Sequence, residues 1–220
     1  MDISGIITKS IISLYNQEIR KYIGASSIGN KCDRAIWYGF VGEKQNELKP
    51  ELMTTFDVGK RLEGLILDYM DAANLNVVRP TKNNNYLFFQ DSDVLEFQGH
   101  ADGILIIPGG ERVIIEIKTA KSSSFVKFKN KGLREWQKLY YAQLQSYLGM
   151  SGYKRGVLIA INKDSSDLHH EWVDYDDIYY HELKTRASSI AKSKEPPERI
   201  NKSPLFYTCN TCSYKESCHK

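Results

Sequence analysis

Three ionisable residues stand inside or beside apolar runs in the middle of the chain, where buried strands are expected. Asp102 ends the segment GHAD at 99–102, and Glu116 and Lys118 lie in the run VIIEIK at 113–118. Charged residues are seldom buried unless they are paired or bind a metal. Because Glu116 and Lys118 are two residues apart, a strand would place both side chains on one face, about 6.6 Å apart. Two carboxylates and an ammonium at one place suit a hard divalent cation, most naturally Mg²⁺, with the lysine beside the water that the metal activates.

The composition is that of a soluble globular protein. A chain of 220 residues is long enough for one domain with a full core, and its 41% hydrophobic and 26% charged residues are ordinary values. No apolar run approaches the roughly 18 residues that a membrane span needs, and the first fifteen residues lack the features of a signal peptide. We therefore expect a cytoplasmic protein, or a nuclear one in a host with a nucleus. The net charge of +3 is too small to indicate a polyanionic partner by itself.

The candidate residues must be positioned by helices and strands that the spacing of apolar residues predicts. Amphipathic helices are expected over 3–22, from an N-cap at Ser26 to about 40, and over 53–70. The third helix places Glu63 in its apolar stripe, where the carboxylate either pairs with a basic neighbour at a solvated edge or points into the core. Strands that form hairpins are expected at 76–80, 86–90, 94–100, 102–107, 112–118, 155–162 and 168–173. A last helix is expected from an N-cap at Asp174 or Asp176 to about 191.

A basic segment follows the candidate metal strand directly. Residues 118–131 contain five lysines and no acidic residue, with two phenylalanines interleaved. A solvated loop is one interpretation, but the position next to the strand favours phosphate binding, with the aromatic rings available to stack on bases. The candidate DNA-binding residues are Lys121, Lys127, Lys129, Lys131, Phe125 and Phe128.

The next expected helix, over 133–150, carries an apolar stripe with one polar member. Trp136, Tyr140, Gln143 and Tyr147 share one face, and most of that face is expected to be core. Gln143 is the exception, because a buried amide needs hydrogen-bond partners.

The four cysteines are distributed in a way that packing does not explain. Three fall within the last twelve residues as Cys209-x2-Cys212-x5-Cys218, in a polar tail, and Cys32 is the only candidate for a fourth ligand. In a reducing compartment such thiols favour a metal site over disulfides. Four thiolates suit a [4Fe-4S] cluster and Zn²⁺ equally well. Four unrelated free thiols are the weaker interpretation.

Taken together, Glu63, Asp102, Glu116-Ile117-Lys118 and Gln143-x3-Tyr147 resemble the PD-(D/E)XK nuclease superfamily in its RecB-like branch. The cysteines before and after these motifs make the chain similar to the iron-sulfur Cas4 and AddB-type exonucleases, from residue 26 to residue 218. The resemblance implies an α/β (α+β) fold of the restriction-endonuclease type, a mixed β-sheet flanked by helices. An N-terminal helix (1–25) would precede the nuclease core (26–191), and a cysteine tail (192–220) would close with Cys32.

The resemblance also implies roles for the motif residues. Asp102, Glu116 and the backbone carbonyl of Ile117 would bind Mg²⁺ or Mn²⁺, and Glu63, where many Cas4-like members have histidine, would complete the metal ligands. Lys118 would orient or deprotonate the attacking water. Gln143 and Tyr147 would contact DNA or hold Lys118 in place. His100 is a further candidate, either facing the substrate beside Asp102 or forming a structural hydrogen bond.

The expected function is therefore that of a metal-dependent deoxyribonuclease. It would be an exonuclease acting on single-stranded DNA or DNA ends in recombination, repair, phage DNA processing or CRISPR adaptation, with proteins of those processes as partners. A non-cleaving module that binds DNA ends or assembles a complex is the rival from another class. A site-specific or RNA-directed endonuclease would use the same chemistry.

Overall fold

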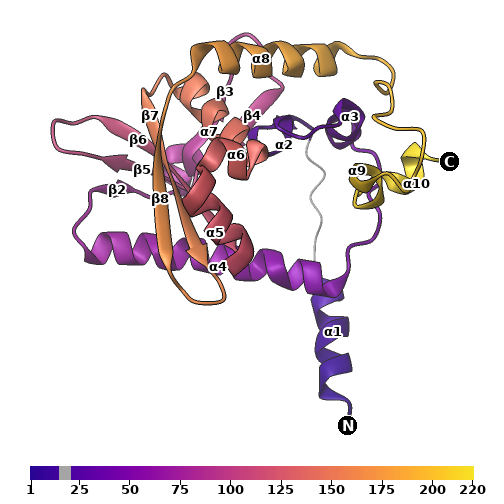
Figure 1. The fold of residues 1–220 in the computed structure, drawn as a ribbon, viewed down its shortest axis with the longest axis horizontal. Helices are drawn as coiled ribbons and strands as arrows, with labels where there is room; N and C mark the ends of the chain where they lie inside the picture. Colours follow the sequence, from indigo (N-terminus) through magenta and orange to yellow (C-terminus); the bar gives the residue numbers. More distant parts are fainter. Residues whose placement is uncertain (15–20) are drawn as a thin grey trace.

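The computed structural model describes residues 1–14 and 21–220, which form two β-sheets with helices on both sides of the larger one (Figure 1). The larger sheet has five strands in the order β2-β5-β6-β7-β8. Only β6 and β7 run parallel, and the other neighbours are antiparallel, so the sheet is mixed. These strands are β2 (Val77–Val78), β5 (Gly103–Ile106), β6 (Arg112–Ala120), β7 (Arg155–Asn162) and β8 (Leu168–Asp174).

A second sheet of three short strands lies beside the first. Its order is β1-β4-β3, with β1 parallel and β3 antiparallel to β4. The strands are β1 (Ile23–Gly24), β3 (Phe88–Gln90) and β4 (Phe97–His100). β4 leads through Ala101 and Asp102 directly into β5, so the GHAD segment joins the two sheets.

The helices occupy both faces of the five-stranded sheet. One apolar cluster joins Ile66, Leu67 and Met70 of α4 to β5, β6 and β7, and another joins α5, α6 and α7 to the opposite face. α8 packs outside α7. The helices are α1 (Ile3–Leu14), α2 (Ala25–Ile28), α3 (Asp33–Val41), α4 (Pro50–Ala72), α5 (Ser122–Lys131), α6 (Leu133–Trp136), α7 (Lys138–Ser151), α8 (Asp177–Lys192), α9 (Tyr207–Asn210) and α10 (Lys215–Cys218), with a 3₁₀ helix η1 (Lys82–Leu87).

β6 alternates between these two layers, as its sequence predicts. Ile115 and Ile117 belong to the cluster under α4, whereas Ile114 belongs to the cluster under α7. Glu116 and Lys118 have the parity of Ile114, so they leave the strand on the α7 face. The mixed sheet with flanking helices confirms the expected fold class at that level.

Several elements differ from the prediction. The expected second helix is two helices, α2 and α3, and the helix expected over 133–150 breaks at Gln137, whose φ of −152° and ψ of 94° are extended. The basic segment is a helix, α5, where a loop was one interpretation, because Phe125 and Phe128 are three residues apart and both face the core.

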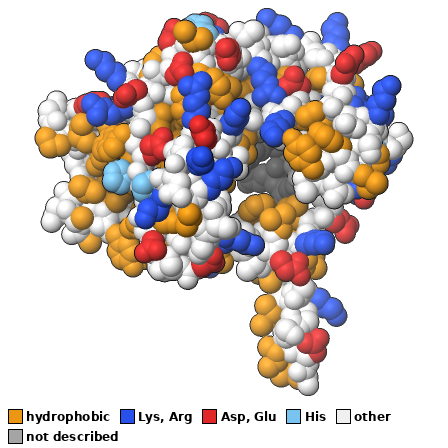
Figure 2. Space-filling model, viewed as in Figure 1, with side chains coloured by type: hydrophobic (Ala, Val, Ile, Leu, Met, Phe, Trp, Pro, Cys, Tyr) orange, Lys and Arg blue, Asp and Glu red, His pale blue; other side chains and the backbone are white. Residues whose placement is uncertain are grey.

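The N-terminal helix also differs from its expected packing role. α1 ends at Leu14, and residues 15–20 of the predicted 3–22 helix lie outside the described residues. α1 buries none of its side chains and projects away from the rest, with its hydrophobic residues visible on the surface (Figures 1 and 2). None of the described helices is both long and apolar enough to cross a membrane.

Candidate active site

Asp102 is fixed against β6 by a backbone hydrogen bond. It immediately precedes β5, and its Oδ2 accepts a hydrogen bond from the Ile117 N–H at 2.7 Å. Burial raises the pKa of Asp102, although nearby Lys118 and the Ile117 N–H oppose the shift. The carboxylate is thereby held next to the two strand residues that flank Ile117.

Glu116 is the most unusual of these residues. Its side chain is 0% exposed and lies 2.5 Å from Lys118 Nζ through Oε1, yet neither of its oxygens accepts a hydrogen bond of ordinary geometry from the described residues. Burial, followed by the charge of Asp102, raises the pKa of Glu116 to about 8 in spite of Lys118. A buried carboxylate without ordinary hydrogen bonds is costly, and here only Oε1 has a partner, the Lys118 ammonium, so Oε2 is left without one among the described residues.

Glu63 approaches the same place from α4. Burial and then the charge of Asp102 raise the pKa of Glu63 to about 7, and Lys118 acts in the opposite direction. Glu63 on α4 is therefore within electrostatic range of Asp102, before β5, and of Lys118 on β6. Glu63 is half-buried, and its pKa responds to Asp102 and Lys118 as well as to its helix neighbour Lys60, so both interpretations of Glu63 keep support.

Lys118 is the cation within this acidic group. Burial alone would lower the pKa of Lys118, but Glu116 and Asp102 outweigh it and the pKa rises. The ammonium therefore stays charged, and its side chain keeps 19% of its surface exposed. It also lies over the ring of Tyr140, 5.1 Å from the centroid.

The donor set fits a hard divalent cation in its chemistry. Three carboxylates stand near one another with raised pKa values, one ammonium cannot neutralise them all, and the Glu116 oxygens lack hydrogen bonds. A divalent cation would supply both the charge and the oxygen partners. Within residues 1–14 and 21–220, however, no three His, Cys, Asp or Glu side chains are already arranged to hold a metal ion.

Gln143 and Tyr147 of α7 support the backbone that leads to Asp102. Both are buried, Gln143 Nε2 donates to the Tyr147 hydroxyl at 3.1 Å, and that hydroxyl donates to the His100 carbonyl at 2.6 Å. Tyr147 therefore holds the backbone two residues before Asp102. His100 is exposed, and its Nδ1 lies 3.1 Å from the Tyr86 carbonyl, so its ring has a backbone partner.

Gly99 lets Tyr147 reach this backbone. A Cβ at Gly99 would lie 2.7 Å from a Tyr147 ring carbon and 2.9 Å from the Ala25 Cβ. We expect Gly99→Ala to lower the free energy of unfolding by about 1–3 kcal/mol because of overpacking, as measured by urea denaturation. Gly64→Ala on α4 is the matched control, since a Cβ there meets nothing within 4 Å. Equal stabilities of the two variants would contradict this prediction.

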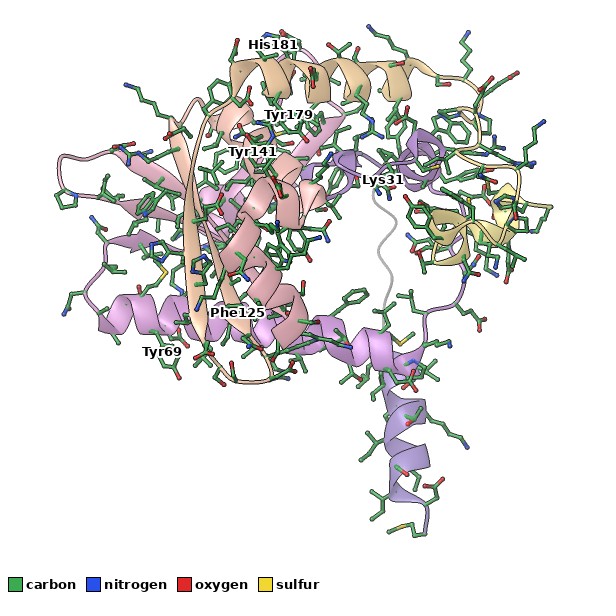
Figure 3. The ribbon with its side chains drawn as sticks, viewed as in Figure 1. Lys31, Tyr69, Phe125, Tyr141, Tyr179 and His181 are labelled. Carbon is green, nitrogen blue, oxygen red and sulfur yellow. The ribbon has the colours of Figure 1, made fainter. Side chains whose placement is uncertain are left out.

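The predicted DNA-binding residues divide into two groups. Lys121, Lys127, Lys129 and Lys131 are exposed along α5. Phe125 and Phe128 are 2% and 0% exposed and pack in the core, so the prediction that their rings stack on bases is wrong. Phe125 lies between α5 and β8 (Figure 3). The helical spacing that puts the lysines outside puts these rings inside.

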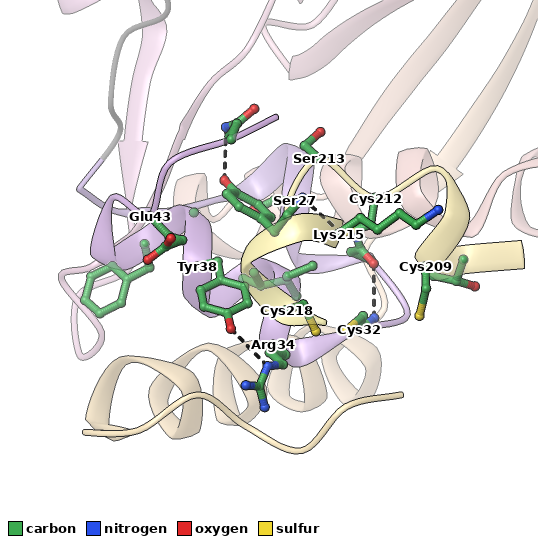
Figure 4. Close-up of a pocket in the computed structure, with 18 of the residues that line it drawn as sticks. Ser27, Cys32, Arg34, Tyr38, Glu43, Cys209, Cys212, Ser213, Lys215 and Cys218 are labelled. Carbon is green, nitrogen blue, oxygen red and sulfur yellow. Dashed lines mark hydrogen bonds between the residues drawn. The ribbon is translucent and has the colours of Figure 1, made fainter. Parts of the chain in front are cut away.

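The four cysteines meet at one cavity of about 1090 Å³ between α3 and the C-terminal segment (Figure 4). Burial, followed by the neighbouring cysteines, raises the pKa of Cys209. Two hydrogen bonds also hold the tail: Asn46 N–H donates to the Ser213 carbonyl at 2.7 Å, and Ser217 Oγ donates to Glu43 at 2.8 Å. The four-cysteine metal site predicted from Cys32, Cys209, Cys212 and Cys218 is not formed as a ligand set among the described residues.

The sequence pattern did not single out one neighbour of the site. Tyr140 belongs to the aromatic stripe of α7 that was assigned to the core, but its ring faces Lys118. The sequence signal for its place beside the site was that it lies three residues before Gln143, on the same face of the helix.

Comparison with known proteins gives a family match and a set of similar folds. Residues 15–154 match the family model described as the YqaJ-like viral recombinase domain. None of the curated proteins matches the sequence. LHK-Exo, an alkaline exonuclease from Laribacter hongkongensis, has a similar fold with a TM-score of 0.58 and 14% identity, over 83% of this chain and 90% of that chain.

Two further solved structures resemble the chain. A phage-related exonuclease from Haemophilus somnus 129PT gives a TM-score of 0.55 at 15% identity, over 83% of this chain and 95% of its own. A protein named SSO0001 gives 0.59 at 18% identity, over 97% of this chain and 94% of its own. At these identities the likeness establishes a shared fold.

Proposed function

The chain belongs to the YqaJ-like viral recombinase domain family, and from this premise we propose that it is a metal-dependent DNA exonuclease of recombination or phage DNA processing. The single observation that carries the proposal is the group of Glu63, Asp102, Glu116 and Lys118, in which Glu116 is fully buried and the other three are half-buried. The name of LHK-Exo as an alkaline exonuclease supports the same reaction. The matched family differs from the Cas4-like branch that the cysteines suggested, so that branch is not part of the proposal.

Each residue of the site has a role in phosphodiester hydrolysis. Glu63, Asp102, Glu116 and the Ile117 carbonyl would hold Mg²⁺ or Mn²⁺. When bound, the ion would polarise a phosphate oxygen and lower the pKa of a water molecule. Lys118 keeps a positive charge beside the carboxylates, where it orients the attacking water and stabilises negative charge on the phosphate oxygens. Asp102 is fixed for this task by the Ile117 N–H.

The central experiment compares DNA substrates and metals. We expect purified protein to degrade linear DNA with Mg²⁺ or Mn²⁺ and to stop in EDTA, because a divalent cation would supply the positive charge that activates water and phosphate. Linear, circular, single-stranded and RNA substrates separate our preferred substrate, single-stranded or end-containing DNA, from those of an endonuclease. Binding of DNA ends without any cleavage in either metal would overturn the proposal in favour of the non-cleaving module. A cytoplasmic location and partners from recombination or CRISPR adaptation accompany the proposal as predictions.

The exposed lysines of α5 would bind the DNA backbone. Lysine is a point charge that contacts phosphate without reading sequence. We expect Lys127→Ala to weaken binding of all DNA sequences alike and to reduce the slope of log K against log salt by about 1. The measurement uses the Glu116→Gln protein, so that DNA is not cut, and Lys192→Ala on α8 is the control. An unchanged slope would exclude phosphate contact by Lys127.

We also propose that the cysteine cavity holds a structural metal centre, either [4Fe-4S] or Zn²⁺. The support is that the four thiols line one cavity, and that burial and the neighbouring cysteines raise the pKa of Cys209 and of Cys212. Anaerobic purification followed by metal analysis and a visible spectrum distinguishes the two, because the cluster absorbs visible light and Zn²⁺ does not. We expect Cys32→Ser to lose the metal and Ser213→Ala to keep it. Wild-type protein that contains neither iron nor zinc after anaerobic purification would overturn the proposal of a structural metal centre.

A further inference from the structure

The ring of Tyr140 is the second partner of the Lys118 ammonium. Nζ of Lys118 lies 5.1 Å from the ring centroid, within the range of a cation–π interaction. The Tyr140 hydroxyl makes no hydrogen bond within residues 1–14 and 21–220. Because Nζ lies over the ring, the contact is made by the face of the ring.

Two further rings hold Tyr140 in place from α5 and α6. Trp136 meets Tyr140 edge to face, with centroids 5.5 Å apart, and stacks on Phe128 at 4.5 Å. The Trp136 indole N–H donates to Ser124 Oγ at 2.8 Å, which fixes the middle ring. Phe128 and Trp136 are 0% and 7% exposed, so this row of rings is rigid and starts in the core.

The row explains what the aromatic residues of α5 do. Phe128 was expected to stack on DNA bases, but its ring is buried against Trp136. Through Trp136 and Tyr140 it instead supports the position of Lys118.

The other partner of Lys118 has a competing task. Glu116 pairs with Lys118 at 2.5 Å, but it is also the carboxylate whose oxygens lack hydrogen bonds and would bind metal. A metal ion bound to Glu116 would weaken the attraction between this carboxylate and the Lys118 ammonium, because the negative charge would be shared between two cations. The Tyr140 ring is neutral and does not compete for metal, so its hold on Lys118 persists.

We propose that Tyr140 is a positioning residue, whose ring face keeps Lys118 directed at the reacting phosphate when Glu116 binds metal. This inference rests on the proposed nuclease function. It assigns no chemical step to Tyr140, whose ring acts only through Lys118.

Two substitutions separate the ring from the hydroxyl. With saturating metal, Tyr140→Leu is expected to lower kcat for DNA hydrolysis roughly 3- to 30-fold, the value of a cation–π contact, and to change KM by less than about twofold. Tyr140→Phe keeps the ring face and is expected to remain within about twofold of wild type in both constants. Wild-type kcat in Tyr140→Leu, or an equal loss in Tyr140→Phe, would overturn the proposal.

A second measurement does not depend on nuclease activity. Acylation of Lys118 at one fixed pH, read by peptide mass spectrometry relative to exposed Lys192, reports how firmly the ammonium is held. With Mn²⁺ bound, we expect Tyr140→Leu to raise this ratio several-fold and Tyr140→Phe to leave it unchanged. If the wild type cuts no DNA but the ratios behave in this way, the nuclease assignment fails and the positioning of Lys118 stands. Identical ratios in all three proteins would refute it.

Discussion

Glu116→Gln is expected to reduce DNA hydrolysis on the order of 10³-fold, the scale on which active sites lose a charge that acts in the transition state. Glutamine keeps the size of the side chain and one oxygen but removes the negative charge that would bind metal. The neutral amide is not expected to unfold the protein, because it removes the repulsion between Glu116 and Asp102 and leaves Asp102 as the counter-charge of Lys118. A melting temperature at or above that of the wild type at pH 8, together with the lost activity, separates chemistry from folding.

Lys118→Met tests the other half of the same pair. The methionine fills the space of the aliphatic stem but leaves Glu116 and Asp102 without their cation, so both activity and stability should fall. The double variant Glu116→Gln/Lys118→Met is expected to recover part of the stability and none of the activity, because the two residues are coupled. Lys192→Met, an exposed lysine on α8, is the control and should match the wild type.

Two results would contradict this account of the site. Full activity of either single variant at saturating metal would exclude its residue from the reaction. A double variant that is less stable than both single variants would show that the two side chains do not form a compensating buried pair.

The charged residues of the site could be found from the sequence because each breaks a local pattern. Glu116 and Lys118 interrupt a β-branched run with a period of two, so their common face follows from strand geometry alone. Glu63 was ambiguous, since a carboxylate on a helical stripe fits both a solvated edge and a buried site. Its electrostatic interaction with Asp102 depends on the packing of α4 against the sheet, which no local pattern contains.

The aromatic residues show the limit of the same reasoning. Phe125 and Phe128 alternate with lysines, a pattern that suits a nucleic-acid surface as well as an amphipathic helix. The burial of both rings between α5 and the sheet shows that the segment is an amphipathic helix. This burial depends on where β7 and β8 place their apolar side chains, which the local sequence does not reveal. Tyr140 was assigned to the core because it lies on the apolar face of its helix. Its contact with Lys118 comes from the tertiary structure and leaves no mark in the local sequence.

The stability of the metal-free protein is expected to fall as pH rises from about 4 to about 8 and to level off above that, and added Mg²⁺ or Mn²⁺ should reverse the fall. Burial and the charge of Asp102 raise the pKa of Glu63 to about 7 and of Glu116 to about 8 in the folded state, above the value of about 4.3 in an unfolded chain. Since folding raises these pKa values, the folded state binds protons more tightly. The resulting contribution to stability is fully present below the unfolded pKa and is lost as pH rises through the folded pKa.

A metal acts in the opposite direction because it binds the ionised carboxylates. At a concentration about 100-fold above Kd, it should raise the melting temperature by about 5–10 °C at pH 9 and by much less at pH 6, where protons compete for the same oxygens. Scanning fluorimetry at both pH values, with metal and with EDTA, measures this difference. Glu116→Gln should show a flatter decline in EDTA and a smaller response to metal. A response of equal size in that variant, or a larger one at pH 6 than at pH 9, would place the metal elsewhere than on Glu116.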